Sequence, residues 1–271
     1  MKTKWLPSTC YSVLTLIVLL FFTFPFIWML LASFKTQVQV LSTDHMFFFT
    51  PTFKNYVEVF EQNDYIHFLW NSFLVAVGST LAALLLGLPA AYAIARYRLH
   101  AFATVILIAK IIPGISYLVP WYILFTKLHL VDTITVLVLS HMVIGLPLIM
   151  WIMIPFFESF PMEVEESSWI DGSSKIRAFA SIVLPISLPG IVTSGLLAFI
   201  FSWNNFMFSL ILSGEKTKTL PIAVFNFISS SSINWGGLMA AACIIIMPVL
   251  IMALLTQKYV VSGLSAGAVK G

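Results

Sequence analysis

Long segments without charged residues alternate with short polar ones along most of the chain. Five segments contain no Asp, Glu, Lys or Arg, and a sixth contains only Lys110: residues 5–34, 65–95, 133–157, 178–214, 219–257 and 99–126. A helix needs about 20 apolar residues to cross the roughly 30 Å hydrocarbon layer of a membrane. The pattern therefore predicts six membrane-spanning segments, at about residues 10–34, 68–95, 102–126, 133–157, 182–212 and 237–258.

The predicted spans are expected to be helices, because lipid offers the backbone no hydrogen-bond partner and the segments are too long for barrel strands. Lys2 and Lys4 precede the first span, just as basic residues precede the apolar part of a signal peptide. Its apolar run of about 25 residues exceeds the usual 7–15, and no small-residue cleavage site follows. We therefore expect a retained span and an all-α integral membrane protein.

Composition excludes the soluble alternatives. The chain has 14 Lys and Arg and 11 Asp and Glu, or 9% charged residues, whereas soluble domains carry about 25%. A soluble globular protein, a disordered chain and a coiled coil are excluded. The net charge of +3 is small and dispersed, so we expect no nucleic-acid partner. Cys10 and Cys243 lie in apolar segments and indicate neither a disulfide framework nor a metal site.

The distribution of basic residues predicts the orientation. Six spans leave both termini on one side of the membrane. Cytoplasmic termini place eight Lys and Arg inside and five outside, which agrees with the excess of basic residues in cytoplasmic loops of membrane proteins.

The loop at residues 158–181 contains five of the eleven acidic residues. Pro161 suits the first turn of a helix. Glu163, Glu165 and Glu166 follow, where negative charge meets the positive end of the helix dipole. The loop is thus predicted to begin with a short helix beneath the membrane.

The second half of this loop predicts a turn and another short helix. Gly172 is a typical helix stop, and Ser173 and Ser174 can cap a following helix. Trp169 and Ile170 are apolar side chains that could dock into a groove on a partner. The alternative is an ordinary polar loop that happens to be helical.

The spacing of residues in this loop resembles that of a known family. The loop contains Glu166-Ser-Ser, then Gly172 after three residues, and Ile182–Pro185 after nine more. This spacing is similar to that of the E-A-A loop of permease subunits of ATP-binding-cassette importers, and residues 158–181 are therefore called the coupling loop. Asp171 and Pro189 also match. The chain departs at Ser167 and Ser168, where the family has alanines, but serine is small enough to keep the close helix approach.

Other segments resemble the carbohydrate-uptake branch of that family, of the maltose type with six spans. They are Pro113-Gly114, Leu128–Thr133, Ser202–Phe206, Thr219–Pro221 and the terminal Gly263–Gly271. The resemblance runs from about residue 10 to the end of the chain. It implies a type I ABC importer permease fold with cytoplasmic coupling helices, in a bacterial or archaeal cell (inner) membrane.

The resemblance implies a subunit that forms half of the pathway of an ATP-driven, binding-protein-dependent sugar importer, with an oligosaccharide as substrate. Its partners would be a second related permease, two cytoplasmic ATPases, an extracellular or periplasmic sugar-binding protein and membrane lipid. The chain would be no enzyme and would bind no cofactor, with ATP and Mg on the ATPases. Independently, the sequence has no G-x-x-x-x-G-K-[ST] phosphate loop.

The same resemblance divides the chain into residues 1–66, an N-terminal helix and outer loop; 67–262, a five-helix core with the coupling loop; and 263–271, a cytoplasmic tail. It assigns contact with the ATPase to residues of the coupling loop and, for the tail, to Ala268–Gly271. The predicted coupling residues are Glu163, Glu166, Ser167, Ser168, Trp169, Ile170, Asp171, Gly172 and Phe179.

Three polar residues within the spans are candidates for the substrate pathway. Lys110 is a cation within the third span, and a charge there is costly unless it faces water or a partner. It could bind sugar hydroxyls or an acidic group, or pair structurally with a carbonyl or an acid of the second permease. Asn204 and Asn205 lie beside aromatic residues that suit sugars, or else form hydrogen bonds between helices.

Two other functions are weighed against an importer subunit. A secondary transporter or channel for a small polar solute is disfavoured by the lack of an inverted repeat and by the coupling loop. A membrane enzyme is disfavoured because all the acidic residues lie in loops.

Overall fold

The computed structural model describes residues 8–62, 64–228 and 233–266. Within these ranges the chain is helical, and an isolated bridge between Ile228 and Ile233 is the only β-pairing. The chain divides into two compact units: one from the N-terminus to Tyr65 together with Val224–Met247, the other from Ile66 to Ala223 together with the chain from Pro248.

The first unit is built on α1 (Ser8–Ser33), α2 (Gln37–Leu41) and α3 (Lys54–Gln62), with η2 (Val224–Phe227) and the beginning of α14 (Trp235–Ala266). The buried Asn55 amide donates to the carbonyls of Ser33 and Lys35, at 2.7 and 2.8 Å. Lys35 is itself buried, and its ammonium donates to the Met46 carbonyl at 2.7 Å. The bond to Ser33 satisfies the last carbonyl of α1, which has no partner within the helix.

The second unit is a helix bundle whose core lies between α4 (Tyr65–Tyr97), α7 (Ile134–Glu158) and α11 (Leu188–Trp203). Small residues allow these helices to approach closely. A Cβ added at Gly145 would lie 3.6 Å from the Cβ atoms of both Ala83 and Ala198, and one added at Gly190 would lie 2.9 Å from the Phe156 ring. Such small-residue contacts are typical of helices packed within membranes.

Four helices in the described ranges are long and apolar enough to cross a membrane: Tyr11–Ser33, Tyr65–Tyr97, Ile134–Glu158 and Trp235–Tyr259. They coincide with the predicted spans at 10–34, 68–95, 133–157 and 237–258. A fifth candidate is the pair Lys175–Ile186 and Leu188–Trp203, bent by 78°. The predicted span at 182–212 is therefore not one continuous helix, because α11 ends at Trp203 and α12 (Met207–Leu212) follows a break.

The predicted span at 102–126 is also broken. It comprises α5 (His100–Ile111) and α6 (Ile115–Lys127), with Pro113 in the interruption. Proline lacks the amide N–H of a helix interior and disfavours helical geometry in the residue before it. Accordingly, Ile112 has extended backbone angles, with φ −66° and ψ 121°.

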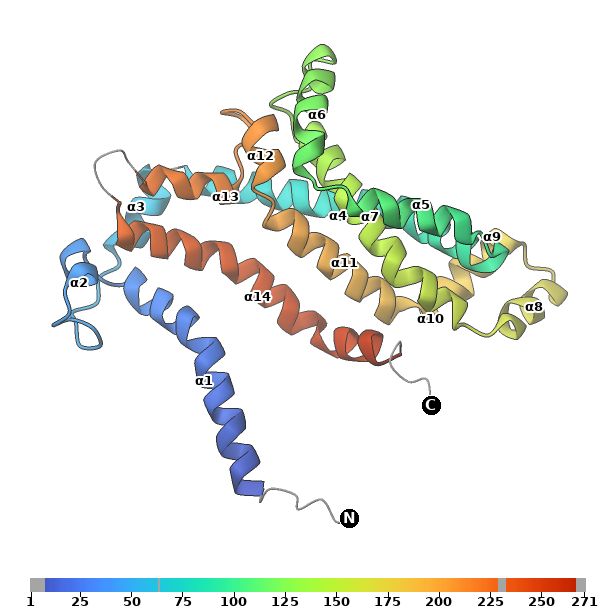
Figure 1. The fold of residues 1–271 in the computed structure, drawn as a ribbon, viewed down its shortest axis with the longest axis horizontal. Coiled ribbons are helices and arrows are strands. Elements are labelled where there is room, and N and C mark those ends of the chain that lie inside the picture. The colour runs from blue at the N-terminus through green and yellow to red at the C-terminus, as the bar shows by residue number, and fades with distance from the viewer. Residues whose placement is uncertain (1–7, 63, 229–232, 267–271) are drawn as a thin grey trace. The chain divides into compact units, whose positions relative to one another are not determined.

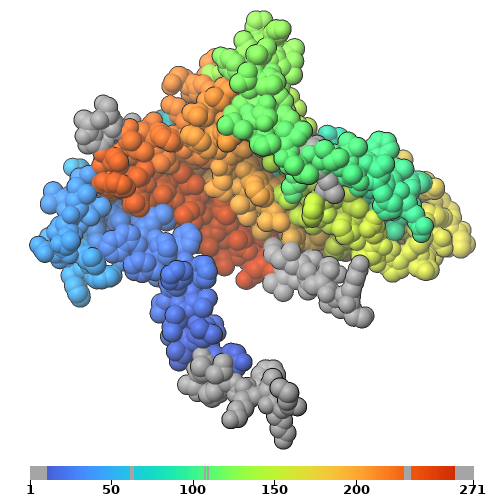
Figure 2. Space-filling view, viewed as in Figure 1, coloured from blue at the N-terminus to red at the C-terminus, as the bar shows by residue number. Residues whose placement is uncertain are grey.

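The ends of α4 and α7 position the two polar regions of the second unit. The coupling loop forms α8 (Met162–Ile170) and α9 (Lys175–Ala178), which lie at one end of these long helices, whereas α6 lies at the other end of α7 (Figure 1). The space-filling view shows the segment of α8 and α9, in yellow, at the surface (Figure 2). The predicted tail at 263–271 is described only as far as Ala266, where α14 ends, so Ala268–Gly271 lie outside the described residues.

Candidate functional site

The coupling loop folds as two short helices joined at a glycine, as the sequence predicts. Gly172 has φ +86°, in the left-handed region that favours glycine. Its N–H donates to the Trp169 carbonyl at 3.0 Å, and the Ser173 N–H donates to the Ser168 carbonyl at 2.9 Å. This pair of bonds is a Schellman cap. The Ser174 hydroxyl then accepts from the Arg177 N–H at 3.3 Å, which caps α9.

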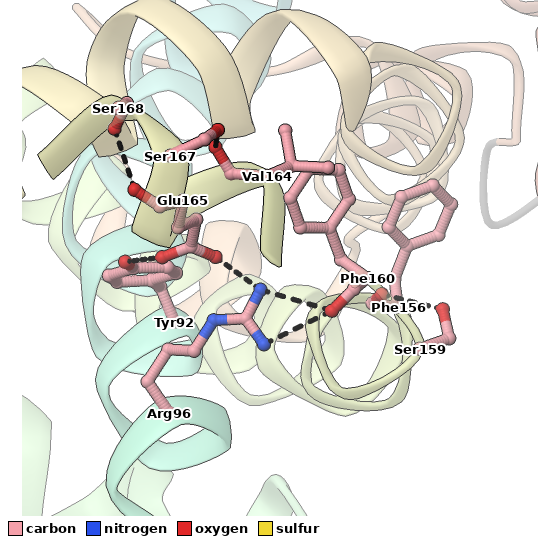
Figure 3. A network of polar contacts seen from close by, with 9 residues as sticks. All are labelled: Tyr92, Arg96, Phe156, Ser159, Phe160, Val164, Glu165, Ser167 and Ser168. Atoms are coloured by element: carbon pink, nitrogen blue, oxygen red, sulfur yellow. Dashed lines mark hydrogen bonds and ion pairs between the residues drawn. The ribbon is translucent and has the colours of Figure 1, made fainter. Parts of the chain in front are cut away.

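The inward face of α8 is fastened by a buried ion pair (Figure 3). Glu165 is fully buried; its carboxylate pairs with the Arg96 guanidinium and accepts a hydrogen bond from the Tyr92 hydroxyl. Arg96 also donates to the Phe160 carbonyl, at 3.3 and 3.4 Å. Because Tyr92 and Arg96 belong to α4, the network joins α8 directly to the end of a long helix.

An aromatic cluster lies beneath this network. The Tyr92 ring contacts the rings of Phe157 and Phe179, with centroids 5.8 and 4.6 Å away. Phe179 begins the π-helical turn η1 (Phe179–Val183). This predicted coupling residue therefore packs at the base of the loop, where it helps to hold η1 against α4 and α7.

The other predicted coupling residues divide into two faces. Glu163, Glu166, Ser167, Ile170, Asp171 and Gly172 are exposed, Trp169 is half-buried, and Ser168 is buried. Ile170 is 86% exposed although it is apolar. The hydroxyls of two serines donate to backbone carbonyls of α8 itself: Ser167 to Val164 at 3.0 Å and Ser168 to Glu165 at 2.8 Å. They therefore need no polar partner outside the helix.

Tyr92, Arg96 and Glu165 were not identified as site residues from the sequence. Glu165 stands between two other acidic residues, and only the rotation of α8 determines which of the three turns inward. The sequence does contain one indication that Glu165 turns inward. Glu165 and Ser168 are three residues apart, so they lie on the same face of the helix. Their partner on α4 could not be read from the pattern, because it lies about 70 residues away in the chain.

The pathway candidates lie at different places in the second unit. Lys110, near the end of α5, lines a cavity of about 470 Å³ between α5, α6, α7, α11 and α12. Asn204 and Asn205 are not among its lining residues. The Asn204 amide donates to the Ile200 carbonyl at 2.9 Å, and the Asn205 side-chain oxygen accepts from the Phe208 N–H at 3.0 Å. Both asparagines thus cap the break between α11 and α12.

Asp132 forms a polar clasp at the opposite end of α7. Its carboxylate accepts from the Thr217 hydroxyl at 2.8 Å and from the backbone N–H groups of Gly214, Lys216 and Thr217, at 2.9, 3.5 and 3.1 Å. Burial raises the pKa of Asp132, but these hydrogen bonds outweigh burial and hold the pKa below its ordinary value of 3.8. Asn71 of α4 donates to the carbonyls of Lys216 and Lys218, both at 3.0 Å, and so binds the same loop.

A protein-family model described as "Binding-protein-dependent transport system inner membrane component" matches residues 83–265. The match covers α7, the whole coupling loop and both helix breaks that border the cavity.

Full-length relatives and a solved structure are also similar. The chain is 36% identical to the trehalose/maltose transport system permease protein MalG of Thermococcus litoralis, over 92% of this chain and 91% of that protein. It is 35% identical to the sulfoquinovosyl glycerol transport system permease protein SmoH of Agrobacterium fabrum, over 92% and 89%. A chain of a bacterial ABC transporter that imports the acidic polysaccharide alginate has the same fold, with a TM-score of 0.79, 20% identity and 95% and 99% coverage.

Proposed function

The chain belongs to the family of binding-protein-dependent transport system inner membrane components, and on this premise we propose that it is a permease subunit of an ATP-driven saccharide importer. The relatives from Thermococcus litoralis and Agrobacterium fabrum support saccharides as the substrate class, because their names refer to trehalose, maltose and sulfoquinovosyl glycerol. The chain forms half of the pathway, and a second related permease forms the other half.

The remaining partners belong to the same proposal. Two cytoplasmic ATPases bind ATP and Mg²⁺, and an extracellular or periplasmic binding protein delivers the saccharide. Both termini and the coupling loop lie in the cytoplasm, and the Asp132 clasp lies on the outer side. The excess of basic residues at the cytoplasmic ends of the predicted spans supports this orientation.

The observation that supports the proposal best is the contrast between the two faces of α8. Outward, it presents exposed acidic side chains and the apolar Ile170, a combination suited to a groove with basic and apolar walls. Inward, Glu165 is bound to Arg96 and Tyr92. A helix that contacts a partner on one face and is bonded to its own chain on the other can pass a movement of the partner on to the chain.

The direction of transmission follows from the connections of α8. The loop follows directly on α7, and the Glu165–Arg96 pair joins it to α4. When the ATPases close and pull α8, both long helices are displaced together. Six residues of α7 line the cavity: Met142, Val143, Ile144, Leu146, Pro147 and Leu148. Movement of this helix therefore changes the width of the pathway.

Ile170→Asp tests the proposed contact with the ATPase. The side chain is 86% exposed, so the change should leave the thermal stability of the isolated permease nearly unaltered. In proteoliposomes that contain the complete transporter, we expect it to lower saccharide uptake and binding-protein-stimulated ATP hydrolysis at least tenfold. Val38→Asp on α2, where the native side chain is 75% exposed, is the matched control and should retain both activities.

Two results would contradict the proposal. Uptake by Ile170→Asp at the level of Val38→Asp would separate α8 from coupling. Uptake by the purified chain without ATP or any ATPase would identify a secondary transporter or channel.

A further inference from the structure

The cavity around Lys110 lies where two helices are interrupted. Ile112 and Gly114 come from the break between α5 and α6, and Phe208 follows the break between α11 and α12. Non-helical backbone at membrane depth is tolerated where it is buried in protein or lines a water-filled cavity. The volume of about 470 Å³ lies within the roughly 300–1,000 Å³ of small-molecule sites.

The walls of the cavity combine aromatic and aliphatic side chains with a single cation. Tyr117, Phe201 and Phe208 contribute rings, and among the described residues that line the cavity Lys110 alone is charged. The Lys110 ammonium lies 4.9 Å from the centre of the Trp151 ring. Aromatic rings suit the C–H faces of a saccharide, and a cation supplies a point of charge recognition.

Lys110 has no anionic partner in the described part of the chain. No carboxylate there forms an ion pair with it, whereas Arg96 is paired with Glu165. It lies about 15 Å along α5 from the first residue, at 1.5 Å per residue. The negative end of the α5 dipole stabilises the ammonium only weakly. Lys110 is exposed where it lines the cavity, so its ammonium is accessible to an anionic group that enters there.

We propose that Lys110 is the charge-recognition residue for an anionic saccharide, one carrying a carboxylate or a sulfonate. This inference rests on the proposed importer function and adds its substrate class. Lys110 binds the acidic group, and the rings of Tyr117, Phe201 and Phe208 in the cavity wall contact the face of the sugar. A neutral saccharide would leave the ammonium without a counter-ion.

The test uses the complete transporter, with its own binding protein, in proteoliposomes. Uptake is measured for matched pairs of radiolabelled saccharides: digalacturonate with digalactose, and 6-sulfoquinovose with glucose. The variants are Lys110→Met and Lys110→Arg. Lys127→Met is the control, because Lys127 is exposed at the end of α6 and does not line the cavity.

We expect an acidic member of a pair to be transported. Lys110→Met should lower its uptake at least tenfold and change any neutral uptake less than twofold. Lys110→Arg should stay within about threefold of wild type, and Lys127→Met should match wild type. If Lys110→Met does not assemble, Lys110→Gln is assessed by the same acidic-to-neutral ratio.

Transport of neutral members only, or an equal loss of acidic and neutral uptake in Lys110→Met, would overturn the proposal. The equal loss would assign Lys110 a structural partner, such as an acid on the second permease. Failure of every saccharide to move, while ATP hydrolysis proceeds, would contradict the importer function itself and is thus distinguishable from failure of the Lys110 assignment.

Discussion

At the scale of single residues, the orientation of α8 depends on a charge that water cannot reach. Glu165 is fully buried, and the Arg96 side chain is 10% exposed. Breaking such a pair is costly because the remaining charge stays buried without a partner, whereas replacing both members by apolar residues is often tolerated. Glu163, two residues earlier, is exposed and has no comparable constraint.

Glu165→Gln should therefore lower the free energy of unfolding by about 3 kcal/mol, since it leaves Arg96 uncompensated. Arg96→Met/Glu165→Leu should recover most of this loss. Glu163→Gln is the matched control, and its effect should remain within about 0.5 kcal/mol. Thermal unfolding of the purified permease complex measures all three. Equal effects of Glu163→Gln and Glu165→Gln would contradict the network.

The Asp132 clasp predicts a dependence of stability on pH. Because its folded-state pKa is lowered, the carboxylate contributes stability that is fully present above the unfolded value of 3.8 and is lost as the pH falls through the folded value. Hydrogen bonds to a charged group contribute about 1.5–3 kcal/mol. We expect Asp132→Asn to lower the melting temperature by about 5 °C at pH 7.

That difference in melting temperature between wild type and Asp132→Asn should be constant from pH 8 to 5 and should shrink below pH 4. Asp44→Asn, at an exposed loop position, is the control and should match wild type throughout. A difference that persisted unchanged at pH 3 would show that Asp132 acts through its shape and not its charge.

The sequence predicted the coupling loop, its glycine turn and its acidic character, because these depend on local signals. It did not predict which acid is buried. Neither Arg96 nor Tyr92 has a local pattern that points to Glu165, and the partnership exists only after α4 and the coupling loop have packed together. Asp132 was likewise recognised only as part of a motif, since its donors come from a loop more than 80 residues later in the chain.

At the scale of helices, contact between α7 and α11 depends on positions without a side chain. A Cβ at Gly190 would lie 2.9 Å from the Phe156 ring and 3.1 Å from the Met153 sulfur. A Cβ at Gly145, on the facing helix, would make only ordinary contacts at 3.6 Å. The two glycines are both buried and helical, yet they differ in the room around them.

Gly190→Ala should destabilise the permease by about 1–3 kcal/mol, because the ring and the sulfur must shift in a packed core. Gly145→Ala should be neutral or stabilising by up to about 1 kcal/mol, because alanine favours the helix and fits the space. The melting temperatures of the two variants in detergent, each compared with that of the wild type, test this difference. Equal losses would show that α7 and α11 do not pack as described.

Element boundaries could be predicted where apolar runs were uninterrupted. Spans at α1, α4, α7 and α14 follow from length and hydropathy alone. The runs at 102–126 and 182–212 predict single helices because they contain at most one charged residue. The absence of charge does not indicate where the backbone leaves the helical conformation. Pro113 was visible as a breaker, whereas the break at Asn204–Phe206 has no proline and uses the Asn205 side chain as a cap instead.

At the scale of the whole molecule, one helix, α7, connects the coupling loop to the cavity around Lys110. The coupling loop begins where α7 ends, and the middle of α7 lines the Lys110 cavity. The Asp132 clasp holds the loop after α12 beside the other end of α7. If α8 contacts the ATPase as proposed, a pull on α8 is expected to displace α7 and thereby the wall of the cavity.

Site-specific photo-cross-linking tests the ATPase contact directly. A photoreactive amino acid at position 170 in the complete transporter should give an adduct with the combined mass of the permease and one ATPase, and the same residue at position 38 should give none. An adduct with the ATPase from position 38 but not from position 170, or labelling of position 170 by a photoreactive lipid in its place, would contradict the role assigned to α8.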